Sequence, residues 1–418
     1  MHAVFVLPRF YPYRGGYENS MLGIARSLVS RGHRATVFTT VADDLESLWL
    51  PGYKVFPAEE FQIEGVAVRR FPICYKRWRR RATRIAGLFP YWRWKAQFWT
   101  PGFRVPGLHE ALRALDSDVV HIGPLPYNNL MYAGLQAAEF RRVRLICTPC
   151  LHLGEAGNRD VAKAYAQPHQ VRMLQRCERV VCMTKFEQQA LTTLGVKADQ
   201  TAVIPHGADL QQATGGDGKR LRELYKIDGP LVLHLGMKAY DKGSVTLVEA
   251  MKTLWARGSN AWLVMAGPSL SAFDQFLAEN GEGLRRLINL PPFADEEKRD
   301  LLAAADLVVQ PSRVESLGLV LVEAWANAKP VVAADIEVSR QLVGESGGGQ
   351  VIGFGDTDSL AKAIEELLHN TEMRSSMGRR GQQFALERFD SRVLSGRAAD
   401  EYERVVAGGR VAVPLSST

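Results

Sequence analysis

The stretch Glu315-Ser-Leu-Gly-Leu-Val-Leu-Val-Glu323 holds two carboxylates separated by seven residues, five of which are aliphatic. It follows an apolar run at 307–309, which has the composition of a buried strand, and the turn Pro311-Ser312. Strand, turn and helix in this order are typical of doubly wound α/β domains. In such domains ligands bind at the carboxyl ends of the strands, so the stretch predicts both the fold class and the place of a binding site.

The polar groups of this stretch indicate what could bind there. Glu315 in the loop and Glu323, about two turns into the helix, can face the same cleft. Between them, the amides of Ser316, Leu317 and Gly318 lie at the positive end of the helix dipole and suit a phosphate. Two hydrogen-bond acceptors flanking an anion site fit a ligand with many hydroxyls and a diphosphate, such as a nucleotide-sugar.

The composition is that of a globular protein, with 46% hydrophobic and 23% charged residues. A length of 418 residues predicts two domains of ordinary size. No apolar run approaches the roughly 20 residues that span a bilayer. The first predicted strand begins close to Met1, so we expect no signal peptide. The five cysteines are few and odd in number, which is typical of reduced thiols and favours a cytoplasmic protein.

Strand-like and helix-length segments alternate along most of the chain, which predicts two successive α/β domains. We place the boundary near residue 207, ahead of a polar, Gly-rich stretch, with domains at 1–207 and 208–390. The predicted strands are 3–7, 35–39, 66–70, 118–122, 143–148, 178–183 and 201–204, then 231–235, 261–266, 286–290, 306–310, 330–334 and 349–352.

Two features of the first half are candidate ligand contacts. Gly15-Gly16 follows the first strand and a turn, and precedes an amphipathic helix, so a ligand could approach its backbone closely. His152 and His121 each follow or end an apolar strand and could orient a hydroxyl acceptor. An ordinary loop glycine pair and structural histidines are the alternatives.

In the second half, Lys238 and Lys242 follow the first predicted strand and could bracket a diphosphate, unless both are simply solvated. We expect no metal site. Cys147 and Cys182 lie inside apolar strands, where cysteine behaves as a small hydrophobic residue. The strings 116–118 and 356–358 are Asp-x-Asp, but they cap a strand and a helix.

Together these motifs resemble the retaining glycosyltransferases of family 4, which have the GT-B fold, and the resemblance runs nearly end to end. The Glu315–Glu323 block is its most specific part. The other matching segments are 15–16, 31–33, 204–209, 242–243, 266–268, 304–306, 329–333 and 387–390.

The resemblance implies two Rossmann-like domains, with the acceptor bound by the first, the donor by the second, and a helix at about 391–408 packing back on the first. It implies a catalytic role for His152, Glu315 and Lys242, with Glu323 on the ribose. It also implies metal-independent transfer with retention. The implied donor-binding residues are Gly15, Gly16, Lys238, Lys242, Gly267, Pro292, Glu315, Ser316, Leu317, Gly318, Leu319 and Glu323, and the implied acceptor-side residues are Tyr11, His121 and His152.

The chain departs from the family pattern at two positions. Met237 stands where the family often has an arginine, and the neighbouring Lys238 lacks the planar fork of that side chain. The loop at 336–338 has no glycine pair. Both departures bear on donor affinity and identity rather than on the fold.

A basic, aromatic segment at 65–109 contains eleven Lys or Arg residues and no acidic residue. Its positive charge is therefore larger than the net charge of the whole chain, which is +7. This composition favours an anionic membrane surface, with a solvated insertion and a nucleic-acid site as alternatives. The residues expected to contact the membrane are Arg77, Trp78, Arg79, Arg80, Arg81, Trp92 and Trp94.

The hypothesis from sequence is therefore hexosyl transfer from an NDP-sugar, with UDP favoured, to a hydroxyl acceptor that a lipid or a glycan precursor could carry. The alternatives are a nucleotide-sugar hydrolase or epimerase of the same fold, and a non-catalytic protein that binds sugar nucleotides or nucleic acid.

Overall fold

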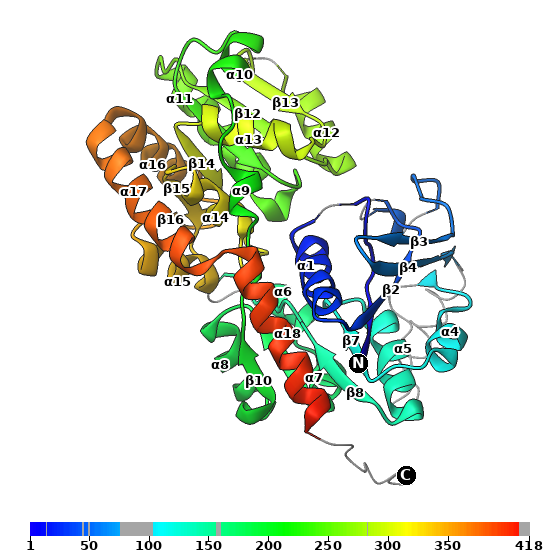
Figure 1. Ribbon diagram of the computed structural model, residues 1–418. Helices are drawn as coiled ribbons and strands as arrows, with labels where there is room; N and C mark the ends of the chain where they lie inside the picture. The colour runs from blue at the N-terminus through cyan, green and yellow to red at the C-terminus, as the bar shows by residue number, and fades with distance from the viewer. Residues whose placement is uncertain are drawn as a thin grey trace. The chain divides into compact units, whose positions relative to one another are not determined.

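The computed structural model describes residues 1–13, 15–43, 46–48, 51–75, 103–155, 160–281 and 283–408. The residues expected to contact a membrane, Arg77, Trp78, Arg79, Arg80, Arg81, Trp92 and Trp94, lie outside these ranges. Contacts divide the chain into two units (Figure 1). Unit 1 comprises Met1–Leu151, Ala162–His206 and Arg392–Thr418, and unit 2 comprises His152–Val161 and Gly207–Ser391.

Unit 1 is built on an eight-stranded sheet with the order β10-β9-β8-β7-β1-β2-β4-β3. All neighbours are parallel except β3, which runs antiparallel to β4 at the edge. The strands are β1 (His2–Val6), β2 (Arg34–Thr40), β3 (Glu60–Ile63), β4 (Val66–Phe71), β7 (Val119–Ile122), β8 (Arg144–Cys147), β9 (Arg179–Cys182) and β10 (Thr201–Val203). A separate antiparallel pair joins β5 (Cys74–Tyr75) to β6 (Phe103–Arg104).

The order of strands reverses between β1 and β7. From β1 the chain continues to β2 on one side, whereas β7, its other neighbour, continues to β8 on the opposite side. Every residue of both central strands is buried, as expected for parallel strands covered on both faces.

Unit 2 has a six-stranded, fully parallel sheet with the order β13-β12-β11-β14-β15-β16. The strands are β11 (Leu231–Leu235), β12 (Trp262–Ala266), β13 (Leu287–Leu290), β14 (Leu307–Gln310), β15 (Val331–Ala334) and β16 (Gly349–Ile352). Here the order reverses between β11 and β14. A core of Val, Leu, Met and Ala side chains joins this sheet to its helices.

Helices alternate with the strands in both units (Figure 1). In or entering unit 1 they are α1 (Gly16–Ser30), η1 (Glu46–Leu48), α4 (Leu108–Ala114), α5 (Asn128–Arg141), α6 (Asp160–Tyr165), α7 (Pro168–Leu174), α8 (Lys185–Thr193), η2 (Ala198–Gln200) and α18 (Ser391–Ala407). In unit 2 they are α9 (Leu210–Ala213), α10 (Gly218–Leu224), η3 (Tyr240–Lys242), α11 (Ser244–Ala256), α12 (Ser271–Glu279), α13 (Asp295–Ala304), α14 (Leu319–Ala326), α15 (Glu337–Ser346), α16 (Thr357–His369) and α17 (Thr371–Arg388).

The doubly wound α/β prediction is confirmed, and each of the thirteen predicted strands is present. The edge strand β3 was missed because its half-exposed residues include Glu60 and Gln62 rather than an apolar run. One assignment needs correction. We expected residues 152–161 in the first domain, but their contacts group them with unit 2, where Glu155 bridges Ile336 in the loop after β15.

The C-terminal helix α18 belongs to unit 1. Its Tyr402 hydroxyl bonds His121 on β7, and Arg31 after α1 donates to Asp400 at 2.7 Å. Gly23 on α1 leaves room for Ser395.

Candidate active site

The loops after β11 and β14 of unit 2 are tied together at the carboxyl edge of the sheet. Gly243, which ends η3 and precedes α11, has φ of 70°, and a Cβ there would lie 2.2 Å from the Pro311 carbonyl oxygen. The Arg313 amide donates to the Asp241 carbonyl at 3.1 Å. Because no side chain separates the loops at Gly243, Lys242 is brought directly against the residues that follow β14.

Lys242 and Glu315 form the centre of this edge. The Lys242 ammonium lies 2.7 Å from the Glu315 carboxylate and donates to the Val314 carbonyl at 2.7 Å. Gln310 donates to the same carboxylate at 3.2 Å. Burial would raise the pKa of Glu315, but Lys242 outweighs it and holds the pKa below its ordinary value. The carboxylate is therefore ionised and held in place.

His152 joins Lys242 and Glu315 within unit 2. Burial and the Lys242 ammonium lower the pKa of His152 to about 4, against the raising effect of a hydrogen bond with the Glu315 backbone. The imidazole is consequently neutral at pH 7. A neutral imidazole can accept a hydrogen bond from a hydroxyl or donate one. The structure thus brings together the three residues for which the family resemblance implies a catalytic role.

The segment that carries His152 is anchored by charge. Arg313 lies 3.3 Å from Glu155 and 2.8 Å from Asp241, so one guanidinium joins this segment to the loop after β11. Arg313 was not among the residues predicted from the sequence. Its place two residues before Glu315 was the available signal, but nothing in the sequence indicated that Glu155 would be its partner.

The start of α14 has the expected geometry for an anion. Gly318 caps the helix in the left-handed region, with φ of 82° and no side-chain cap. In the described part of the chain, the amides of Ser316, Leu317 and Gly318 donate no hydrogen bond to the protein. Leu319 is the first helical residue, and the N-terminal dipole favours negative charge there.

Glu323, further along α14, is paired with a residue that the sequence analysis did not single out. The Lys298 ammonium on α13 lies 2.8 Å from the Glu323 carboxylate, and both side chains are mostly buried. Burial would lower the pKa of Lys298, but Glu323 and Asp295 hold it above its ordinary value. The pair restricts the orientation of the Glu323 carboxylate.

Lys238 does not lie with Lys242 in this structure. Its side chain is buried, and the ammonium donates to Asn289 at 2.6 Å and to the Leu290 carbonyl at 2.7 Å. These contacts tie the loop after β11 to the end of β13, which is a structural role. The expectation that Lys238 contacts a diphosphate is therefore corrected, because its ammonium is directed at the end of β13.

Gly267 and Pro292 follow β12 and β13 on the same edge. A Cβ at Gly267 would lie 2.2 Å from the Gly236 carbonyl oxygen, so glycine allows the loops after β11 and β12 to touch. Pro292 is exposed two residues after β13 ends.

The unit 1 candidates lie around the end of β1 and in β7. Gly15 caps α1 without a side-chain bond, and Gly16 is exposed. The Tyr11 carbonyl accepts from Arg70 at 2.9 Å. His121, in contrast, is buried against Phe5 and Tyr402, and burial lowers its pKa to about 3. Its expected contact with an acceptor is corrected to a structural one, because α18 covers it.

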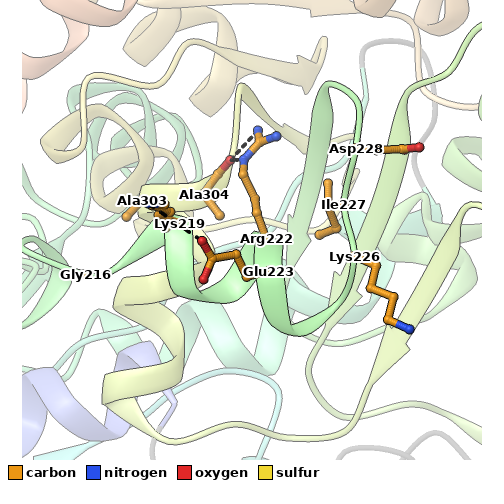
Figure 2. Close-up of a pocket in the computed structure, with 10 residues that line it drawn as sticks. Gly216, Lys219, Arg222, Glu223, Lys226, Ile227, Asp228, Ala303 and Ala304 are labelled. Atoms are coloured by element: carbon orange, nitrogen blue, oxygen red, sulfur yellow. Dashed lines mark hydrogen bonds and ion pairs between the residues drawn. The ribbon is translucent and has the colours of Figure 1, made fainter.

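A hollow of about 750 Å³ lies elsewhere on unit 2, where α10 and α13 meet the amino end of β11 (Figure 2). Arg222 lines it, and its guanidinium donates to the Ala304 carbonyl and to Asp306, both at 2.7 Å. This hollow is at the wrong end of the strands to hold the expected ligand. It is lined by Gly216, Gly218, Lys219, Arg222, Glu223, Lys226, Ile227, Asp228, Ala303 and Ala304.

The rejected metal motifs have structural partners. Asp118 accepts from the His2 amide at 2.7 Å, and Asp356 caps α16 by accepting from Ser359 at 3.0 Å. Within the described ranges, no group of three or more His, Cys, Asp or Glu residues could hold a metal, and the five cysteines are free thiols. No described helix is long and apolar enough to cross a membrane.

Comparisons with known proteins agree with this geometry. A family profile described as "Glycosyl transferases group 1" matches residues 220–384, and one described as "Glycosyl transferase 4-like domain" matches residues 15–207. Phosphatidyl-myo-inositol mannosyltransferase of Mycolicibacterium smegmatis is 25% identical over 98% of this chain and 95% of its own length.

Two further comparisons differ in extent. Alpha-D-kanosaminyltransferase of Streptomyces kanamyceticus is 29% identical over 44% of this chain, and the match spans about half of that relative, 48% of its length. The structure of Anabaena HepE in complex with UDP and glucose superposes with a TM-score of 0.72 and 21% identity, over 97% of this chain and 100% of that chain. With one profile on each sheet and the fold shared end to end, the chain belongs to the glycosyltransferases of family 4, with the GT-B fold.

Proposed function

We propose that this protein transfers a hexosyl group from a nucleoside diphosphate sugar, with UDP as the nucleotide, to a hydroxyl acceptor, with retention of configuration. The observation that carries the proposal is the mostly buried Lys242–Glu315 pair at the carboxyl ends of β11 and β14, with His152 beside it. A cation, an oriented carboxylate and a neutral imidazole are the groups that such a transfer needs at the reacting carbon.

The donor would bind along the carboxyl edge of the unit 2 sheet. Lys242 and the amides of Ser316, Leu317 and Gly318 would neutralise the diphosphate as it leaves, the kind of preorganised stabilisation that lowers a transition-state barrier most. Glu315 would hold the sugar and Glu323 the ribose hydroxyls. The base would lie against Gly267 and Pro292. Anabaena HepE, whose structure contains UDP and glucose, supports uracil as the base.

His152 would orient the acceptor hydroxyl, since its neutral ring can share a proton with it. The proposed mechanism is front-face attack, in which the leaving phosphate oxygen takes the acceptor proton as the glycosidic bond forms. It invokes no enzymic nucleophile and no metal. A double displacement would need two carboxylates about 5 Å apart, which the motifs do not predict.

The acceptor is proposed to be a polyol or glycan precursor, and a lipid could carry it. Phosphatidyl-myo-inositol mannosyltransferase, by its name, acts on a lipid of this kind. The basic aromatic segment at 65–109 supports an anionic membrane surface as a partner, on sequence alone. Arg79, Arg80 and Arg81 replaced together by Ser should lower binding to anionic vesicles in a sedimentation assay, and unchanged binding would remove the membrane proposal.

The transfer proposal is tested by incubating the full chain with UDP-sugars and measuring UDP release with and without a membrane extract. Release that depends on the extract supports transfer. Release that is independent of it indicates a hydrolase, and the absence of release from every UDP-sugar indicates a binding protein or another nucleotide. A parallel series with GDP-sugars and ADP-sugars separates the last two outcomes.

A further inference from the structure

The carboxyl edge of unit 1 has its own place for a ligand. In an open α/β sheet the crevice forms where the strand order reverses, and in unit 1 this is between β1 and β7. Arg9 lies in the loop after β1, and Tyr127 lies after β7 at the start of α5. Burial raises the pKa of Tyr127 to about 12, and the opposing effect of the Arg9 charge shows that the two groups are near each other.

Arg9 is a buried cation held by few contacts. Its side chain is 11% exposed, one nitrogen lies 3.6 Å from Glu18 on α1, and the guanidinium covers the Tyr13 ring at 3.9 Å. Burial disfavours the charge, but Glu18 and Tyr13 keep the pKa of Arg9 above its ordinary value. The guanidinium therefore stays charged inside the crevice.

Several buried donors that follow β1 and β8, or begin α1, have no hydrogen-bond partner in the described part of the chain. They include Nε and Nη1 of Arg9, the Tyr17 hydroxyl in the first turn of α1, and the Thr148 hydroxyl after β8. Gly123, after β7, makes room for the Tyr17 hydroxyl, since a Cβ there would lie 2.7 Å from it. Buried polar groups are rarely left unpaired in native proteins, so the two unpaired nitrogens of the Arg9 guanidinium point to an absent ligand.

We infer that the crevice between β1 and β7 binds an anionic polyol through Arg9, and that the acceptor of this enzyme carries a phosphate. Phosphate offers three strong acceptor oxygens, and arginine is the side chain best suited to pair with it. The Tyr17 and Thr148 hydroxyls would contact the polyol. Assigning this ligand as the acceptor rests on the proposed function, whereas the anion site itself does not.

The test uses inorganic phosphate with the full chain and saturating UDP, which occupies the diphosphate site proposed in unit 2. Phosphate binding is followed by thermal shift and by ³¹P NMR. Arg9→Met should weaken phosphate binding at least tenfold. The phosphate affinity of Arg9→Lys should lie between those of the wild type and Arg9→Met, because lysine keeps the charge but lacks the planar guanidinium. Glu18→Gln should tighten binding several-fold, because it removes the negative charge that competes for the guanidinium.

Arg26→Met is the matched control. Arg26 lies on α1, the helix that carries Glu18, in an exposed pair with Glu64, and its replacement should leave phosphate binding unchanged. Glu18→Gln keeps the inference testable if Arg9→Met does not fold. A purely structural Arg9–Glu18 pair predicts the same phosphate affinity in Glu18→Gln as in the wild type, and that result would overturn the site.

Two competitors then separate the sources of the phosphate. Glycerol 3-phosphate represents a soluble acceptor, and phosphatidylglycerol vesicles represent a lipid headgroup. At least one of them must displace inorganic phosphate from the wild type, and displacement by neither would overturn the inference. The affinity for UDP, measured in the same variants, should not change. A wrong donor-site proposal would appear in the UDP measurements and a wrong anion-site inference in the phosphate measurements, so the two can be told apart.

Discussion

Two carboxylates, one mostly buried and one fully buried, show how differently the two units treat charge. Glu315 in unit 2 lies 2.7 Å from Lys242, and this ammonium holds its pKa below the ordinary value despite burial. Within the described ranges, the Glu187 carboxylate in unit 1 accepts hydrogen bonds from two backbone amides, those of Leu151 at 2.7 Å and Met183 at 2.5 Å. Burial raises its pKa to about 7, against those hydrogen bonds. At pH 7 the parallel sheet of unit 2 therefore holds an ionised Glu315, whereas Glu187 in unit 1 is about half protonated.

The difference extends to the whole carboxyl edge of each sheet. In unit 2 the charged groups proposed to bind the donor, Lys242, Glu315 and Glu323, already have partners of opposite charge. In unit 1 the buried Arg9 keeps donors without partners among the described residues. A preformed site fits a ligand common to many relatives. Unpaired hydrogen-bond donors such as those of Arg9 fit a ligand that supplies the missing acceptors. We therefore expect unit 1 to determine which acceptor substrate the protein selects.

The largest expected effect is on stability, and it shows whether unit 1 can be destabilised without destabilising unit 2. Tyr402→Ala should lower the free energy of unfolding of unit 1 by about 3–5 kcal/mol, because it leaves a cavity under α18 and an unpaired His121. Tyr402→Phe removes the hydroxyl alone and should cost about 1 kcal/mol. Hydrogen exchange read by mass spectrometry should show faster exchange in unit 1 peptides only. Equal acceleration in unit 2 peptides would show that the two unfold together.

Next comes the paired centre of unit 2. Lys242→Ala should lower kcat about 10²–10³-fold, or about 2.7–4 kcal/mol, because it removes the cation proposed to stabilise the leaving diphosphate. Steady-state UDP release measures this. Lys252→Ala is the matched control, since Lys252 lies on α11 in a partly exposed pair with Glu249 and should leave kcat unchanged. A similar loss in both variants would contradict the assignment.

The contrast between the two acids predicts a pH dependence. Between pH 4.5 and 7 Glu187 is protonated in the folded chain and ionised in the unfolded one, so unfolding releases a proton and stability falls as the pH rises. The free energy of unfolding should therefore drop by about 2–3 kcal/mol more in the wild type than in Glu187→Gln across this range. Urea titrations at several pH values measure it. Parallel curves for the two proteins would place the pKa near the ordinary value.

A smaller effect is expected at the proposed ribose contact. Glu323→Ala should weaken UDP binding about tenfold, about 1.4 kcal/mol, through the loss of one charged hydrogen bond to the hydroxyls. Lys298→Met should weaken it less, since it only frees the carboxylate to reorient. Calorimetry with UDP and with 2′-deoxy-UDP gives the measurement. Undiminished discrimination between the two nucleotides in Glu323→Ala would remove the ribose assignment.

The fold could be predicted almost completely because its strands are short apolar runs that alternate with helix-length segments. The block at 315–323 also identified one edge of the second sheet. Side-chain partners could not be predicted. The lysines at 238 and 242 look equivalent in sequence, yet only the geometry of the loops turns Lys238 toward Asn289 and Lys242 toward Glu315. The pairing of Lys298 with Glu323 depends on how α13 packs, which no local pattern encodes.

The missing methyl group at Gly243 has a consequence for how this enzyme could evolve. A side chain there would meet the Pro311 carbonyl at 2.2 Å in a backbone conformation that only glycine adopts freely. Any replacement would have to lift Lys242 away from Glu315. Gly243, which is assigned no contact with substrate, would then constrain turnover as tightly as Lys242 next to it. Substitutions at Gly243 would lower the turnover rate before they lower the stability of the protein.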